Sequence, residues 1–209
     1  MAADKEKGGK ITTLLFDLGG VLIDVHQQRF VTALSEMFPR IEPELLEQVF
    51  FRSSFKDALE RGRLSPAAFC REAGGELGLH IDESIFTPVW SSIFSEKKEI
   101  TALLPQLQQR FTLILLSNTN KPHIDYITAV FPFLAVFKHR FYSYETGFLK
   151  PHPAAFTCVL EPLQLAPESV LFIDDACENV ETARKLGLQA IQFQSDVQCM
   201  KELKYRRIL

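Results

Sequence analysis

The sequence lacks clustered cysteines, long apolar runs and an excess of basic residues. Its four cysteines, Cys70, Cys158, Cys177 and Cys199, are widely scattered among 209 residues. No Cys-x-x-Cys or Cys/His cluster is present, so the sequence offers no zinc-binding pattern. No apolar stretch reaches the ~20 residues of a membrane-spanning helix. We therefore expect reduced, mostly buried thiols, no membrane association and a cytoplasmic location.

The charge balance argues against nucleic acid or an anionic membrane as the main partner. The formal net charge is −3 and the isoelectric point is about 6.0, whereas both partners require a basic face. The N-terminal segment "MAADKEKGGK" has no apolar core of the kind found in secretory signals. We expect residues 1–10 to be a short disordered lead-in.

Four apolar segments end in polar residues. They are "TTLLFDLGGVLIDV" (12–25), "FTLILLSNTN" (111–120), "SVLFIDDACEN" (169–179) and "GLQAIQFQ" (187–194). Continuous apolar strands of this kind are typical of a parallel sheet that is buried on both faces. Helical patterns separate them, at 97–109, 122–130, 153–160 and 176–186. Alternating strands and helices predict an α/β fold with a doubly wound, Rossmann-like parallel sheet.

Residues 26–96 have a different character. Their apolar spacing predicts helices over 26–38, 43–59, 65–77 and 82–94, separated by turn signals such as "RGRLSP" and "AGGELG". We expect residues 11–25 and 97–209 to form the core. Residues 26–96 would be a helical cap inserted after the first strand and closing over the carboxyl edge of the sheet.

The strand-ending polar residues point to one binding site. Open α/β sheets bind ligands beyond the carboxyl ends of their strands. That rule brings together Asp17, Ser117, Asn118, Asp174 and Asp175, and Lys150 of "GFLKPHP" is expected beside them. Three clustered carboxylates repel one another unless they share a cation. Hard oxygen ligands without His or Cys favour magnesium, and the metal, the lysine and backbone N–H groups would then hold a phosphate.

These residues also carry a family resemblance. The sequence resembles haloacid dehalogenase-like hydrolases, because four motifs of that superfamily occur in order: "FDLGGVL" with Asp17, "LLSNTN" with Ser117, "LKP" with Lys150, and "FIDDACEN" with Asp174 and Asp175. The resemblance covers residues 11–195. It is strongest to the sugar-phosphate (glucose-1-phosphate) phosphatases and to the N-terminal phosphatase domain of epoxide hydrolases. It implies a magnesium-dependent phosphomonoester hydrolase, monomeric or homodimeric, whose partner is a small phosphorylated metabolite.

The resemblance also implies roles for these residues. Asp17 would be the nucleophile that forms an aspartyl-phosphate, and Gly19 would offer its carbonyl to magnesium. Asp175 would bind the metal directly, with Asp174 acting through a metal-bound water or as a second ligand. Ser117 and the N–H of Asn118 would bind phosphoryl oxygens, Lys150 would neutralise charge, and Asn179 would orient Asp175 or a metal-bound water.

Gly19 departs from the family pattern. Most phosphatases of this superfamily have a second aspartate there, acting as general acid and base. General acid–base catalysis is typically worth ~10²–10⁴-fold. Three explanations are open: the substrate has a good leaving group such as an anomeric oxygen, another residue such as Asp24 or His26 substitutes, or the protein is a poor enzyme or none.

Two alternative functions remain at this stage. A 2-haloacid dehalogenase uses the same aspartate on carbon without a metal, which the paired Asp174 and Asp175 disfavour. A non-catalytic module that binds a phosphometabolite is favoured only by Gly19. In the cap, Arg61 and Arg63 of "ERGRL" are expected either in a solvated turn or in contact with substrate. The sequence does not identify the phosphate ester or the pathway.

Overall fold

A five-stranded parallel sheet lies at the centre of the computed structural model, which describes residues 10–209. The strand order is β5-β4-β1-β6-β7, and every neighbouring pair is parallel. The strands are β1 (Thr13–Phe16), β4 (Thr112–Ser117), β5 (His139–Tyr142), β6 (Val170–Asp174) and β7 (Gln189–Gln192). This arrangement confirms the predicted α/β fold. The predicted lead-in over residues 1–10 lies almost wholly outside the described residues.

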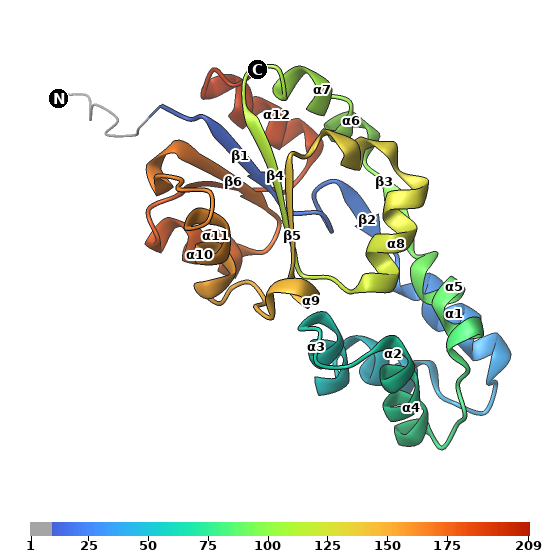
Figure 1. Ribbon diagram of the computed structural model, residues 1–209. Coiled ribbons are helices and arrows are strands. Elements are labelled where there is room, and N and C mark those ends of the chain that lie inside the picture. The colour runs from blue at the N-terminus through green and yellow to red at the C-terminus, as the bar shows by residue number, and fades with distance from the viewer. Residues whose placement is uncertain (1–9) are drawn as a thin grey trace.

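Helices cover both faces of the sheet (Figure 1). Alternate strand residues point to opposite faces, so Leu15 and Phe172 pack on one side while Leu14 and Leu171 pack on the other. Helices α10 (Ala154–Leu160) and α11 (Cys177–Lys185) cover the first side. The second side is covered by α6 (Lys98–Thr101), α7 (Leu104–Leu107), α8 (Lys121–Val130) and α12 (Asp196–Tyr205). Two-sided burial explains why the central strands β1, β4 and β6 are apolar along most of their length.

Five helices occupy residues 27–91, in the first part of the chain between β1 and β4. They are α1 (Gln27–Met37), α2 (Pro43–Phe51), α3 (Ser54–Glu60), α4 (Pro66–Leu77) and α5 (Glu83–Ser91). A cluster of aromatic rings joins them, with Phe30 at 4.9 Å from Phe50 and 5.0 Å from Trp90 between ring centroids. Figure 1 shows α2, α3 and α4 grouped beyond one end of the sheet. The aromatic cluster accounts for part of the high phenylalanine content of the sequence.

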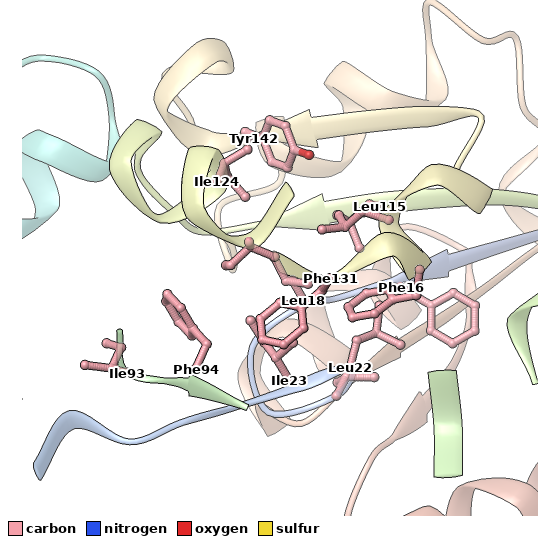
Figure 2. Packing of buried hydrophobic residues seen from close by; sticks show 14 of the residues in the cluster. Phe16, Leu18, Leu22, Ile23, Ile93, Phe94, Leu115, Ile124, Phe131 and Tyr142 are labelled. Atoms are coloured by element: carbon pink, nitrogen blue, oxygen red, sulfur yellow. The ribbon is translucent and has the colours of Figure 1, made fainter. Parts of the chain in front are cut away.

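A short antiparallel ribbon connects these helices to the sheet. It consists of β2 (Ile23–Val25) and β3 (Phe94–Glu96). Figure 2 shows Leu18, Ile23 and Phe94 in one apolar cluster with Ile124 of α8. The remaining elements are α9 (Ser143–Thr146) and the 3₁₀ helices η1 (Pro132–Val136) and η2 (Pro167–Ser169). None of the helices between residues 10 and 209 has both the length and the apolarity needed to cross a bilayer.

Local structure departs from the sequence expectations at several points. The helix expected over 43–59 is two helices, because Ser53 caps α3 by accepting a hydrogen bond from the Lys56 N–H. The helix expected over 97–109 is also two short helices, with Pro105 in the first turn of the second. The sequence analysis missed β2, β3 and β5. Each has only three or four residues, and β5 is a half-exposed edge strand without the continuous apolar run of the central strands.

Candidate active site

Three carboxylates converge at the carboxyl ends of β1 and β6. Asp17 follows β1, Asp174 ends β6 and Asp175 follows it, while β1 and β6 are adjacent in the sheet. Each carboxylate places one oxygen within 4.8 Å of the others. Asp174 is fully buried, Asp17 is 9% exposed and Asp175 is exposed. Parallel pairing of the two strands is what brings these residues together, since they are about 157 positions apart in the chain.

Lys150 lies between two of these carboxylates. Its ammonium group is 2.8 Å from Oδ1 of Asp17 and 2.6 Å from Oδ2 of Asp174, and its side chain is only 1% exposed. Burial alone would lower the pKa of Lys150, but the two carboxylates outweigh it and raise that pKa. The lysine is therefore held as a cation.

The three carboxylates and one lysine leave the site with an excess of negative charge. Burial raises the pKa of Asp17 to about 7, although the Lys150 ammonium opposes the shift. Burial, followed by the negative charge of Asp174, also raises the pKa of Asp175. Burial is the main cause of both shifts and the charge of Asp174 adds to it, so a cation bound among these carboxylates would favour their ionised forms.

Asp174 is surrounded by hydrogen-bond donors. Its Oδ1 accepts from the Ala176 N–H at 2.9 Å and from Nδ2 of Asn179 at 2.9 Å. Its Oδ2 accepts from Lys150 and, at 3.0 Å, again from Nδ2 of Asn179. A carboxylate has about four lone-pair positions, and these bonds engage them. Asp174 is thus positioned to hold Lys150 in place.

Asn118 holds the backbone of the lysine loop. Its side-chain amide donates to the Lys150 carbonyl and accepts from the Lys150 N–H, both at 2.8 Å. Ser117, at the end of β4, is 3% exposed and lines the same cavity as Asp175. The segment around Lys150 is therefore tied to the end of β4 by its backbone and to β1 and β6 by its side chain.

Gly20 allows Asp175 to approach the loop that follows β1. Its φ angle is +76°, in the left-handed region, and a Cβ at this position would overlap the Asp175 carboxylate. Gly19 is not under that constraint, because a Cβ there would make only an ordinary contact with Val25. The second glycine of "FDLGG" is thus required by packing, and the first is not.

A cavity of about 450 Å³ opens beside these residues. Its floor is formed by Gly19, Gly20, Ser117, Asn118 and Asp175 at the sheet edge. The opposite wall comes from the helical region and the ribbon, and is formed by Phe51, Lys56, Glu60, Trp90, Ile93 and Phe94. This volume is within the ~300–1,000 Å³ that small-molecule sites usually have.

Residues 11–187 match the haloacid dehalogenase-like hydrolase family. The chain belongs to this family. The match spans the whole sheet except the last strand, β7. The expected class is confirmed: this protein is a HAD-like hydrolase.

Several phosphatases are similar to this hydrolase over nearly its full length. D-ribitol-5-phosphate phosphatase from Bacteroides thetaiotaomicron is 25% identical, with 92% of this chain and 97% of the relative covered. A sesquiterpene phosphatase from Aspergillus oryzae is 24% identical, covering 91% of this chain and 93% of the relative. Among solved structures, a HAD family enzyme of B. thetaiotaomicron in complex with magnesium and inorganic phosphate has a TM-score of 0.79 and 28% identity, covering 88% of this chain and 94% of that one.

The other residues considered from the sequence have contacts elsewhere. Asp24 pairs with Lys97 at 2.6 Å, and Nε2 of His26 is 2.7 Å from the Ser95 hydroxyl. Ser95 lies in β3 and Lys97 directly follows it. Asp24 also lines the cavity. Asn179 was expected beside Asp175 or a metal-bound water, but its amide donates to Asp174.

Arg61, which follows α3, contacts the backbone after α9. Its Nη1 donates to the Gly147 carbonyl at 3.3 Å, at the end of α9. This contact is neither of the two expected for Arg61, a solvated turn or a substrate contact. Arg63 is exposed.

Three of the cavity-lining residues with ionisable side chains were not predicted to lie at the site. Lys56 and Glu60 form an ion pair of 2.8 Å on α3, and Glu60 is 6% exposed. His123 of α8 is also buried and lines the cavity. The only local signal was the i,i+4 spacing of Lys56 and Glu60, which is equally typical of a solvated helix face.

Proposed function

We propose that this HAD-like hydrolase is a magnesium-dependent phosphatase of small phosphorylated metabolites of the sugar-phosphate type. It would act through an aspartyl-phosphate formed on Asp17. The observation that supports this most is the convergence of three carboxylates around one buried lysine at the carboxyl edge of the sheet. The relatives that act on phosphate esters support the same proposal.

The residues present fit a magnesium ion. Magnesium prefers hard oxygen ligands, and the cluster offers three carboxylates without nearby nitrogen or sulfur ligands of the His or Cys type. Asp17, Asp175 and the Gly19 carbonyl would hold it. Asp174, whose oxygens accept hydrogen bonds from Lys150, Asn179 and Ala176, would act through its charge. When bound, the ion would neutralise the clustered carboxylates and the phosphate.

Asp17 is arranged for nucleophilic attack. Its Oδ1 accepts hydrogen bonds from the Leu18 N–H at 2.7 Å and from Lys150. These bonds fix the carboxylate plane, so that Oδ2 forms the new bond to phosphorus while the bond from phosphorus to the ester oxygen breaks. Water then attacks the aspartyl-phosphate, releases inorganic phosphate and restores the carboxylate.

Lys150 and the end of β4 would stabilise the transferring group. The Lys150 ammonium would balance negative charge on the phosphoryl oxygens, and the Ser117 hydroxyl and Asn118 N–H would donate to them. Asn118 holds the Lys150 backbone through its side chain. The backbone N–H of Asn118 would therefore still be able to donate a hydrogen bond to a phosphate.

Gly19 has no side chain that could donate a proton to the leaving oxygen. That proton would come from water or from Asp24, which is the remaining carboxyl near the β1 loop that lines the cavity. Substrates whose leaving oxygen carries negative charge easily, such as anomeric phosphates, are then hydrolysed fastest. Residues 26–96 would serve as the cap that excludes water from this reaction.

A panel of phosphate esters assayed with magnesium and with EDTA tests this function. We expect turnover with magnesium, its loss in EDTA, and a drop of about 1,000-fold or more in Asp17→Asn. Metal-independent chloride release from a chloroacid would instead support the dehalogenase alternative. Absence of turnover with every ester, together with unchanged metabolite binding by Asp17→Asn, would establish the non-catalytic alternative.

A further inference from the structure

The cavity wall opposite the carboxylates carries a partly buried ion pair. Lys56 and Glu60 are one turn apart on α3, and Nζ of Lys56 donates to Oε2 of Glu60 at 2.8 Å. The side chains are 28% and 8% exposed, so both ions have lost most of their water. A single pair of this kind does not by itself stabilise a fold, because the desolvation cost rivals the attraction. Its place in the cavity therefore suggests a role toward a ligand.

Both residues of the pair lie at the cavity beside the active site. Each lines the cavity whose floor is formed by Ser117, Asn118 and Asp175. Helix α3 lies against α9 near the carboxyl edge of the sheet (Figure 1). The Arg61 contact with Gly147 fixes the end of α3 there. The pair is thus held at a set position relative to the phosphate-binding residues.

The pair retains hydrogen-bonding capacity. An ammonium has three donors, and one of them is engaged by Glu60. Within residues 10–209, the second carboxylate oxygen of Glu60 accepts no hydrogen bond. Burial raises the pKa of Glu60, and the Lys56 charge opposes this shift. A ligand hydroxyl is both a donor and an acceptor, so one hydroxyl or two neighbouring hydroxyls can satisfy both groups.

We propose that Lys56 and Glu60 recognise hydroxyl groups on the leaving group of the phosphate ester and exclude alkyl leaving groups. This inference rests on the proposed phosphatase function. The hydroxyls of a sugar or polyol would replace water lost from both ions. An alkyl or prenyl chain would cover the ions without hydrogen bonding to them, which is unfavourable. The apolar residues Phe51, Trp90 and Phe94 would contact the carbon chain of either ligand.

The two phosphatase relatives represent these two chemistries, because ribitol is a polyol and a sesquiterpene is a hydrocarbon. The ion pair places this hydrolase with the first. Each lost hydrogen bond to a charged group typically lowers transition-state binding by about 10- to 100-fold. A polyol phosphate should therefore be hydrolysed at least ~10-fold better than an alkyl phosphate of the same chain length.

The experiment compares sugar and polyol phosphates with pentyl phosphate, which has the carbon chain of D-ribitol 5-phosphate without its hydroxyls. We would measure kcat/KM with D-ribitol 5-phosphate, D-glucose 1-phosphate and pentyl phosphate for the wild type and for Lys56→Met/Glu60→Gln. The double variant removes both charges together and so leaves no unpaired buried ion. We expect kcat/KM for the preferred hydroxylated ester to fall by at least ~10-fold, while that for pentyl phosphate stays the same or rises, because its chain no longer covers two charges.

Two further variants control for structure. Lys121→Met/Asp125→Asn removes an i,i+4 pair on the exposed face of α8 and should change neither activity. Glu60→Gln alone keeps an acceptor oxygen and should lose less activity than the double variant. Urea unfolding of each variant checks that it is folded.

The outcomes separate the two proposals. If the wild type prefers pentyl phosphate, or if the double variant lowers kcat/KM for both kinds of ester equally, the recognition role is wrong and the phosphatase function stands. If no ester is hydrolysed by the wild type, the phosphatase function fails, and the recognition role fails with it.

Discussion

Replacing His123 should remove a defined part of the pH dependence of stability. His123 lies in α8, stacked on Trp90 of α5 with 4.8 Å between ring centroids. Its Nδ1 is 3.1 Å from Nδ2 of Asn120, and its Nε2 is 3.1 Å from the Trp90 carbonyl. The Asn120 amide nitrogen only donates, so Nδ1 must accept and Nε2 must carry the hydrogen. A second proton on the ring would face the Asn120 N–H group and has no acceptor.

The magnitude follows from linkage between protonation and folding. Burial lowers the pKa of His123 from 6.5 to about 3, and the Lys56 charge acts in the same direction. Between pH 6.5 and pH 3 the unfolded chain binds a proton at this residue while the folded chain does not, so stability falls as the pH is lowered. Going from pH 7.5 to pH 5.5, the free energy of unfolding should drop by about 1.4 kcal/mol because of this residue alone.

Urea unfolding at several pH values between 7.5 and 5.5 measures this effect. His123→Gln and His123→Phe both remove the titrating ring, but the first keeps an amide and the second keeps the aromatic stack. The two variants should differ in absolute stability but show the same pH dependence. Between pH 7.5 and pH 5.5, each should lose about 1.4 kcal/mol less of its free energy of unfolding than the wild type loses. If all three proteins lose stability in parallel, His123 is not buried in the neutral form and the reasoning is wrong.

Three further predictions concern the carboxylate cluster. Lys150→Met should lower the free energy of unfolding in EDTA by about 3–5 kcal/mol, because it leaves buried carboxylates without their cation. A loss below about 1 kcal/mol, measured by urea unfolding, would contradict the ion-pair geometry. Gly20→Ala should weaken magnesium binding at least ~10-fold, since the added Cβ displaces Asp175. The affinity is measured by calorimetric titration of magnesium in the presence of inorganic phosphate, and an unchanged value would exclude Asp175 as a ligand. A Cβ at position 19 would make only an ordinary contact with Val25, and Gly19→Asp should raise kcat for esters with poor leaving groups by ~10-fold or more. Equal kcat values would mean that leaving-group protonation does not limit the reaction.

Much of the sheet could be predicted from local pattern. The strands that supply Asp17, Ser117 and Asp174 are continuous apolar runs, because burial on both faces demands apolar residues at every position. The edge strand β5 was missed because its half-exposed side chains carry no such pattern. The break between α2 and α3 depends on one serine cap, which a helical periodicity over 43–59 does not reveal.

Hydrogen-bond partners within the site were harder to predict than its members. Asn179 lies in the first turn of α11, and its partner could have been either of two adjacent aspartates. Asn179 donates to Asp174 because Asp174 is buried while Asp175 is exposed. Successive residues at a strand end point to opposite sides of the sheet. Asn118 likewise holds the Lys150 backbone through its side chain, a pairing across 32 residues that no local pattern contains.

The sequence by itself determined which residues lie at the carboxyl edge of the sheet, because chain direction in a parallel sheet places every strand end on the same side. Tertiary structure alone decided what faces that edge. Lys56, Glu60 and His123 belong to helices whose periodicity specifies a buried face but not the surface it meets. That choice depends on how α3 and α5 pack against α8 and α9, through contacts between segments distant in the chain.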